Sequence, residues 1–196
     1  MFCVVKEGLK DVYVMSAPPS KPQRLLKQRV VRAVPSPDGK WIYFQTIESF
    51  ARSEIWKTPA GLDEPQRLTE GSGYNMQVSP DGHMLYYARI REGEVWVWSV
   101  DVRADSVAAR VPKPLVRNAD TFSPGKRGIY FCPQPSAAKA QVLVYQDLAT
   151  GNITPVYSAP ALRVEYKMGL APDESSLLYS SPELDSAMLT LVEGFV

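Results

Sequence analysis

The segment Ser36-Pro37-Asp38-Gly39-Lys40-Trp41-Ile42-Tyr43-Phe44 joins a turn to a short aromatic strand. Proline presets φ for the first turn position, aspartate can hydrogen-bond its own backbone, and glycine takes a positive φ at no steric cost. The aromatic and branched residues that follow suit a half-buried strand. The segment therefore predicts two antiparallel strands joined by a type I turn with a G1 bulge.

The same turn and strand recur along the chain. The copies read SPDGH-MLYY at 79–87, SPGKR-GIYF at 123–131 and APDES-SLLY at 171–179, and the turn prolines are 43, 44 and 48 residues apart. A second marker, Pro-Gln-Arg-Leu, stands at 22–25 and again at 65–68. Two markers in one phase indicate tandem repeats. The residues assigned to structural turns are Pro37, Asp38, Gly39, Pro80, Asp81, Gly82, Pro124, Pro172 and Asp173.

Two of the turns depart from the pattern. Gly125 comes one position early, and Glu174 stands where glycine is expected. Because glycine is the residue that tolerates a positive φ, we expect these two turns to differ in shape from the others.

Each repeat continues with two more short strands. The third strand is predicted at 12–15, 55–58, 95–98, 142–145 and 188–192, and the fourth at 23–26, 66–69, 115–117 and 153–156. Four short strands in a repeat of this length are typical of a propeller blade. The 17 prolines and the lack of a helical period argue against a helical solenoid. The predicted fold is all-β, a β-propeller of four-stranded antiparallel blades with the innermost strand first.

The repeat boundaries define a single propeller domain over residues 1–196. It holds a partial blade at 1–29, full blades at 30–70, 74–117 and 119–157, and a partial blade at 164–196. An open arc of blades exposes sheet edges, which natural proteins avoid. Three arrangements would cover these edges. The chain is a fragment of a longer propeller, which we favour; or its terminal strands pair with each other; or two chains associate. Open blade edges would promote self-association.

Composition excludes several classes of partner. The net charge is +1 without a run of basic residues, so the sequence predicts no binding to nucleic acid. Apolar stretches are too short to cross a bilayer, and the first residues carry no export signal. Cys3 and Cys132 fall on equivalent strands of non-adjacent repeats, too far apart for a disulfide, and are expected to be buried core thiols.

Residues for catalysis or cofactor binding are scarce. His83, the only histidine, occupies a turn, and the chain has neither a Gly-x-Ser-x-Gly elbow nor the His and Cys ligands of a zinc site. We therefore expect no enzyme activity, no metal and no cofactor. Asp38, Asp81 and Asp173 resemble a ring of carboxylates, but each is expected to serve its own turn. The acidic spacing of 101–105 is interpreted as a solvated insertion rather than a calcium loop.

The innermost strands supply the candidate ligand-binding residues. The innermost strand of a propeller blade lines the axial channel, and polar residues alternate with apolar ones along it. Either these polar residues face a ligand, or they only hydrate the channel or pair with a neighbouring blade. They are Arg32, Asn75, Gln77, Thr121 and Lys167. Trp56, Trp96 and Trp98 could stack on a sugar or peptide, although packing between blades is favoured.

These motifs together resemble a known family. The SPDG turn, the Ile55-Trp56-Lys57 and Val12-Tyr13-Val14-Met15 strands and the Pro65-Gln66-Arg67-Leu68-Thr69-Glu70 ending are similar to the WD-like repeats of the TolB C-terminal domain family. The ending at 185–195 resembles the closing strand of bacterial regulators that join a winged helix to a propeller. The resemblance supplies no catalytic or ligand-binding residues.

The resemblance implies a function and a location. It implies a non-catalytic scaffold for a protein or peptide partner, as a module of a larger bacterial TolB-like or regulator-type protein. The alternative is an accessory gating domain of a prolyl oligopeptidase-like hydrolase whose catalytic domain lies outside this chain. Family resemblance also suggests a periplasmic or otherwise exported protein.

Overall fold

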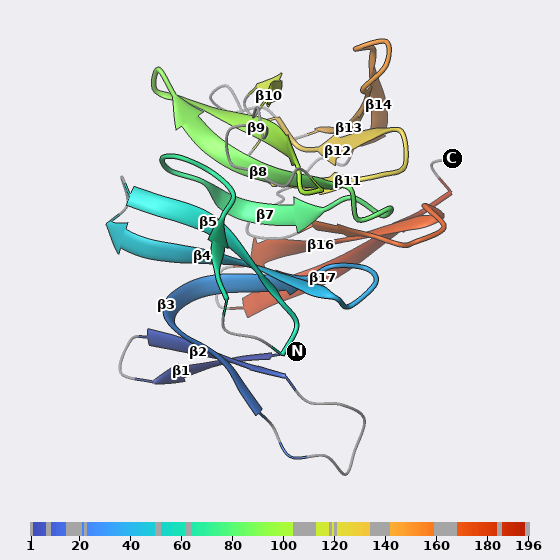
Figure 1. Ribbon diagram of the computed structural model, residues 1–196. Helices are drawn as coiled ribbons and strands as arrows, with labels where there is room; N and C mark the ends of the chain where they lie inside the picture. Colours follow the sequence, from blue (N-terminus) through green and yellow to red (C-terminus); the bar gives the residue numbers. More distant parts are fainter. Residues whose placement is uncertain are drawn as a thin grey trace. The chain divides into compact units, whose positions relative to one another are not determined.

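The computed structural model describes residues 2–6, 9–14, 21, 23–49, 52–61, 64–103, 113–117, 119, 121–133, 142–158, 168–183 and 186–194. These residues form strands and turns and contain no helix (Figure 1). Among the described residues there is no helix of the length and apolar character needed to cross a membrane. The strands are β1 (Phe2–Lys6), β2 (Leu9–Val14), β3 (Gln23–Pro35), β4 (Trp41–Ser49), β5 (Arg52–Pro59), β6 (Gln66–Arg67), β7 (Tyr74–Val78), β8 (Met84–Arg91), β9 (Glu94–Asp101), β10 (Lys113–Arg117), β11 (Phe122–Pro124), β12 (Gly128–Phe131), β13 (Val142–Asp147), β14 (Ile153–Ser158), β15 (Met168–Leu170), β16 (Ser176–Glu183) and β17 (Ser186–Glu193).

The strands pair as antiparallel meanders. The sheets run β1-β2-β3-β4-β5-β6, β10-β9-β8-β7, β11-β12-β13-β14 and β15-β16-β17. In the last three, the strand before the turn motif comes first in the chain and pairs with the strand after it. This order confirms the predicted all-β propeller fold, and each predicted third and fourth strand coincides with or overlaps an observed one.

The first sheet differs from the repeat pattern at one place. The pattern separates a fourth strand at 23–26 from the first strand of the next blade near residue 30, but β3 runs without a break from Gln23 to Pro35. Its first half pairs with β2 and its second half with β4, so one sheet holds six strands (Figure 1). The reason lies in the sequence Leu26-Lys27-Gln28-Arg29-Val30, which contains no glycine, proline, asparagine or aspartate to turn the chain.

The chain divides into two compact units. One comprises Met1–Ile90 with Ser99–Lys113, and the other comprises Arg91–Trp98 with Pro114–Val196. The predicted blade boundaries within a single domain stay a prediction.

Each unit has an apolar core. In the first, Val30, Ile42 and Phe44 are buried together and Trp56 packs against them, as expected of a packing aromatic. The core of the second unit consists of Tyr130, Cys132, Leu143, Met168, Leu177, Tyr179 and Val192. Burial raises the pKa of the Cys132 thiol to about 12, in agreement with a core cysteine. The side chain of Cys3 lies outside the described residues.

The turn motif has the geometry that its sequence predicts. Gly39 and Gly82 have φ values of 71° and 76°. The Gly39 amide donates to the carbonyl of Ser36 at 3.0 Å, and the Gly82 amide donates to the carbonyl of Ser79 at 2.9 Å. Each glycine therefore occupies the left-handed region at the end of a hydrogen-bonded turn.

The turn with Glu174 does not differ in shape, so that expectation was wrong. Glu174 has a φ of 65°, close to Gly39 and Gly82, and its amide donates to the carbonyl of Ala171 at 2.9 Å. The turn with Gly125 does differ, as expected. There the strand pairing continues to Gly125, whose amide donates to the carbonyl of Gly128 at 2.8 Å, so that two residues remain in the loop.

The side chain of Glu174 explains why a non-glycine residue holds this strained conformation. Its Oε1 accepts a hydrogen bond from the amide of Lys126 at 2.6 Å, and its Oε2 lies 3.5 Å from the hydroxyl of Tyr130. A Cβ atom at Gly125 would lie 3.1 Å from the Tyr130 ring and 3.2 Å from both carboxylate oxygens, so a side chain there would crowd the contact. The two irregular turns thus fit together, and the contact offsets a strain of order 1 kcal/mol.

We expect Gly39→Val to destabilise the protein by about 1–2 kcal/mol, because a β-branched residue is penalised at positive φ. No atom lies within 4 Å of a Cβ at Gly39, so the loss comes from the backbone alone. Gly169→Val is the matched control, since its Cβ also meets open space but its φ is not positive. Urea unfolding measures both, and equal stability of the two variants would contradict the turn assignment.

We expect Gly125→Ala and Glu174→Ala to be coupled in a double-mutant cycle. Gly125→Ala should cost on the order of 1 kcal/mol, because the new methyl group crowds the Glu174 carboxylate. The same change should cost at least about 0.5 kcal/mol less when Glu174 is already alanine. Additive unfolding free energies would show that the two turns do not depend on each other.

Candidate functional site

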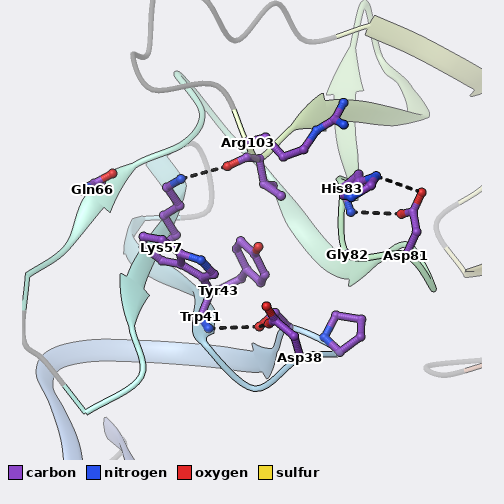
Figure 2. Close-up of a pocket in the computed structure, with 12 residues that line it drawn as sticks. Asp38, Trp41, Tyr43, Lys57, Gln66, Asp81, Gly82, His83 and Arg103 are labelled. Carbon is purple, nitrogen blue, oxygen red and sulfur yellow. Dashed lines mark hydrogen bonds and ion pairs between the residues drawn. The ribbon is translucent and has the colours of Figure 1, made fainter.

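A pocket of about 540 Å³ lies in the first unit, between two copies of the turn motif (Figure 2). One turn contributes its residues from β3 to β4, and the other contributes those from β7 to β8. The strands β5 and β6 and the segment after β9 complete the wall. The lining residues are Ser36, Pro37, Asp38, Trp41, Tyr43, Lys57, Gln66, Asp81, Gly82, His83, Val102 and Arg103.

The carboxylates of Asp38 and Asp81 each close their own turn with one oxygen. Oδ1 of Asp38 accepts hydrogen bonds from the Ser36 hydroxyl at 2.5 Å and the Lys40 amide at 3.1 Å. Oδ1 of Asp81 accepts from the Ser79 hydroxyl at 2.5 Å and the His83 amide at 3.0 Å. These bonds lower the pKa of both carboxyl groups, so both are ionised at neutral pH.

The second oxygen of each carboxylate has weaker contacts. Oδ2 of Asp38 lies 3.8 Å from the Lys40 ammonium, and Oδ2 of Asp81 lies 3.3 Å from Nδ1 of His83. Both aspartate side chains are more than half exposed, at 53% and 62%. Exposed ion pairs of this kind contribute little to stability. The pocket therefore presents two accessible negative charges.

The aromatic part of the wall consists of the half-buried Trp41 and the buried Tyr43. Tyr43 is only 1% exposed, and burial together with the Asp38 charge raises its pKa to about 12. Its hydroxyl is therefore neutral and can both donate and accept a hydrogen bond. Figure 2 shows the Tyr43 side chain between Trp41 and the His83 turn, within the ring of labelled residues.

The basic residues of the wall are held by other parts of the protein. The Lys57 ammonium donates to the Val102 carbonyl at 2.8 Å and lies 4.6 Å from the centre of the Trp41 ring. The Arg103 guanidinium contacts both oxygens of Asp101, at 3.0 Å and 2.6 Å. This bidentate pair lowers the pKa of Asp101 to about 2. The positive charges of the pocket are thus already engaged.

The four described members of the predicted ligand-facing set, Arg32, Asn75, Gln77 and Thr121, are not among the residues that line this pocket. The structure joins two of them, since Nη1 of Arg32 donates to Oδ1 of Asn75 at 2.8 Å. Asn75 lies in a bulge of β7 with a φ of 48°. Gln77 is half-buried and Thr121 is buried, whereas Lys167 lies outside the described residues.

Sequence reasoning treated the turn residues as structural and did not see that two turns share a pocket. Asp38 and Asp81 do serve their own turns, but they also line one cavity. Trp41 is the residue that could have indicated the pocket, because the other repeats have Met84, Gly128 and Ser176 at that position.

His83 is exposed, as expected. Of the 101–105 segment, residues 104 and 105 lie outside the described part.

This arrangement is suited to binding. It offers charges on two turns, and an aromatic wall with a tyrosine hydroxyl on the strand that follows the first turn. No group of three or more histidine, cysteine, aspartate or glutamate residues that could hold a metal is found in the described part of the chain.

The fold is shared with solved β-propeller structures. TolB from Acinetobacter baumannii matches with a TM-score of 0.74 and 18% identity, over 97% of this chain and 48% of that one. A putative TolB from Agrobacterium tumefaciens matches with a TM-score of 0.71 and 19% identity, over 98% and 73%. An acylaminoacyl peptidase from Pyrococcus horikoshii matches with a TM-score of 0.64 and 13% identity, over 94% and 34%.

The class defined by fold is therefore the β-propeller. Within that class the architecture is similar to TolB propeller domains, which confirms the predicted resemblance at the level of the fold. The chain spans about half the length of the Acinetobacter TolB. No family profile and no curated protein sequence matches it.

We expect the free energy of unfolding to fall as the pH rises from about 10 to about 12. Tyrosine in the unfolded chain ionises near pH 10, whereas Tyr43, Tyr87 and Tyr130 have pKa values raised to about 12 by burial. In this window the unfolded state has lost protons that the folded state retains, so alkali favours unfolding. Urea titrations at several pH values measure the slope, which Tyr43→Phe should reduce. A free energy of unfolding that does not change over this pH range would contradict the prediction.

Proposed function

We propose that this chain is a non-catalytic propeller scaffold that binds a protein or peptide, as a module of a larger TolB-like or regulator-type bacterial protein. The pocket between the turns at 36–40 and 79–83 is the observation that carries the proposal. Its carboxylates stand on short hairpin turns and its aromatic groups on strand β4, so a rigid sheet holds them in fixed positions. A periplasmic or exported location remains part of the proposal and rests on the family resemblance.

The proposed binding surface has two parts. The first is the pocket, with its accessible carboxylates and buried tyrosine. The second is the inner-strand set of Arg32, Asn75, Gln77, Thr121 and Lys167, which stays a prediction. The bond between Arg32 and Asn75 supports a pairing role for these two, because it joins equivalent positions of successive repeats. Gln77 and Lys167 then remain the members of this set to test first.

A gating role beside a hydrolase is the second candidate. It is supported by the likeness to the Pyrococcus acylaminoacyl peptidase, of which this chain matches 34% of the length. In that case the catalytic groups would lie on another domain, and this chain would limit access to them. Assays of the purified chain with peptide and ester substrates bear on both candidates. Turnover abolished by a single substitution within this chain would overturn a non-catalytic scaffold.

We expect selection of displayed random peptides on the immobilised chain to enrich sequences that bind with saturable, micromolar affinity. Isothermal titration with synthetic peptides measures the affinity. Asp81→Asn tests the pocket and Gln77→Ala tests the inner strand, with Asn152→Ala as the control because Asn152 lies on an exposed hairpin. Loss in either test variant but not in the control supports the proposal. Failure to enrich peptides above an unrelated propeller would overturn it.

A further inference from the structure

The repeats themselves show why the pocket is open. Gly82 occupies the turn position that Glu174 occupies in the last repeat. The Glu174 side chain reaches the preceding turn, where it contacts the Lys126 amide and the Tyr130 hydroxyl. Tyr43 is the equivalent of Tyr130, but Gly82 has no side chain that could take the place of Glu174. The Asp81 and His83 side chains of that turn instead line the pocket together with Tyr43.

Tyr43 has a hydroxyl group that is available to a ligand. The residue is 1% exposed and lines the pocket, and its hydroxyl has no hydrogen-bond partner among the residues that the structure describes. A ligand in the pocket could therefore form a hydrogen bond with this hydroxyl. Figure 2 places this side chain within the ring of lining residues, close to the Asp38 turn.

The charged groups of the pocket favour a positively charged ligand. Lys57 is engaged with a carbonyl and an aromatic ring, and Arg103 is engaged with Asp101. The second carboxylate oxygens of Asp38 and Asp81 make only exposed contacts within their own turns, to Lys40 at 3.8 Å and to His83 at 3.3 Å, which a ligand can displace at little cost. The Arg103 charge is balanced by Asp101, and the Lys57 ammonium is on a buried residue, so the exposed and weakly paired charges of the pocket are the two carboxylates.

We propose that this pocket receives the arginine side chain of a peptide partner, an inference that rests on the peptide-binding function proposed above. Asp38 and Asp81 would serve as its counter-ions, and the Tyr43 oxygen would accept one of its N–H groups. A guanidinium fits better than an ammonium because its donors form a fixed fork that can contact groups on two turns at once. A cavity of about 540 Å³ also accommodates the peptide backbone that flanks the side chain.

The test uses a matched pair of probes on the full chain. N-acetyl-Gly-Arg-Gly-amide carries the guanidinium, and the same peptide with citrulline is a neutral isostere. Two-dimensional ¹H–¹⁵N NMR follows the amide signals of Gly39 and Gly82. We expect the arginine peptide to shift them saturably, with a dissociation constant on the order of a millimolar. The citrulline peptide should bind at least about tenfold more weakly.

Variants separate binding from folding. Tyr43→Phe removes a hydroxyl that bonds to no described residue, so the urea midpoint should not fall, but binding of the arginine peptide should weaken by about threefold or more. Tyr86→Phe is the matched control, because Tyr86 is the equivalent residue of the next repeat and does not line the pocket. The double change Asp38→Asn and Asp81→Asn retains an acceptor for each turn and should abolish binding.

Two outcomes would overturn the assignment: equal affinity for the arginine and citrulline peptides, or arginine binding that Tyr43→Phe and the double asparagine variant both leave unchanged. The peptide selection described above distinguishes this failure from failure of the scaffold. If selected peptides bind but the arginine probe does not, the pocket assignment falls and the scaffold stands. If the probe binds as expected but no peptide is selected, the scaffold falls and the arginine pocket stands.

Discussion

The hydrogen bonds of the turn aspartate support the rest of the structure. One carboxylate oxygen binds a serine hydroxyl and the amide two residues on, as seen for Asp38 with Ser36 and Lys40. This fixes the left-handed glycine that follows and sets the register in which β3 and β4 pair. Because a slip by one residue would reverse the faces of both strands, the apolar core depends on the same few bonds. In the two turns that line the pocket, one oxygen of each aspartate is used in this way.

Much of the fold follows from the sequence, because its determinants are local. Proline, aspartate and glycine define the turns, and the aromatic residues after them define the strands, so the order of strands could be predicted from one repeat. The continuous β3 could not, since the fourth strands are weak signals and only the absence of turn residues between Leu26 and Val30 distinguishes this join. The conformation of Glu174 was also out of reach, because its strain is offset by the Lys126 amide far away in the sequence.

The candidate site was harder to predict than the fold for a physical reason. Polar residues on inner strands attract attention because alternation marks them, yet two of these, Arg32 and Asn75, bond to each other. The turn residues were fully explained by the turns, so nothing in the sequence pointed to a second role. A pocket formed where successive repeats meet depends partly on positions without a side chain, such as Gly82. The absence of a side chain is a weak signal in a single sequence.

The contact between Glu174 and the turn at Gly125 has a consequence for how such a chain can change over time. Repeat proteins commonly grow and shrink by duplication or loss of whole units, which requires each unit to be complete in itself. Here the turn at 123–127, which lacks an aspartate, is bonded by the Glu174 carboxylate of the next repeat. If either repeat were duplicated, deleted or moved alone, an amide would be left without this partner or Glu174 would keep its strained conformation without the contact. The two must be inherited together.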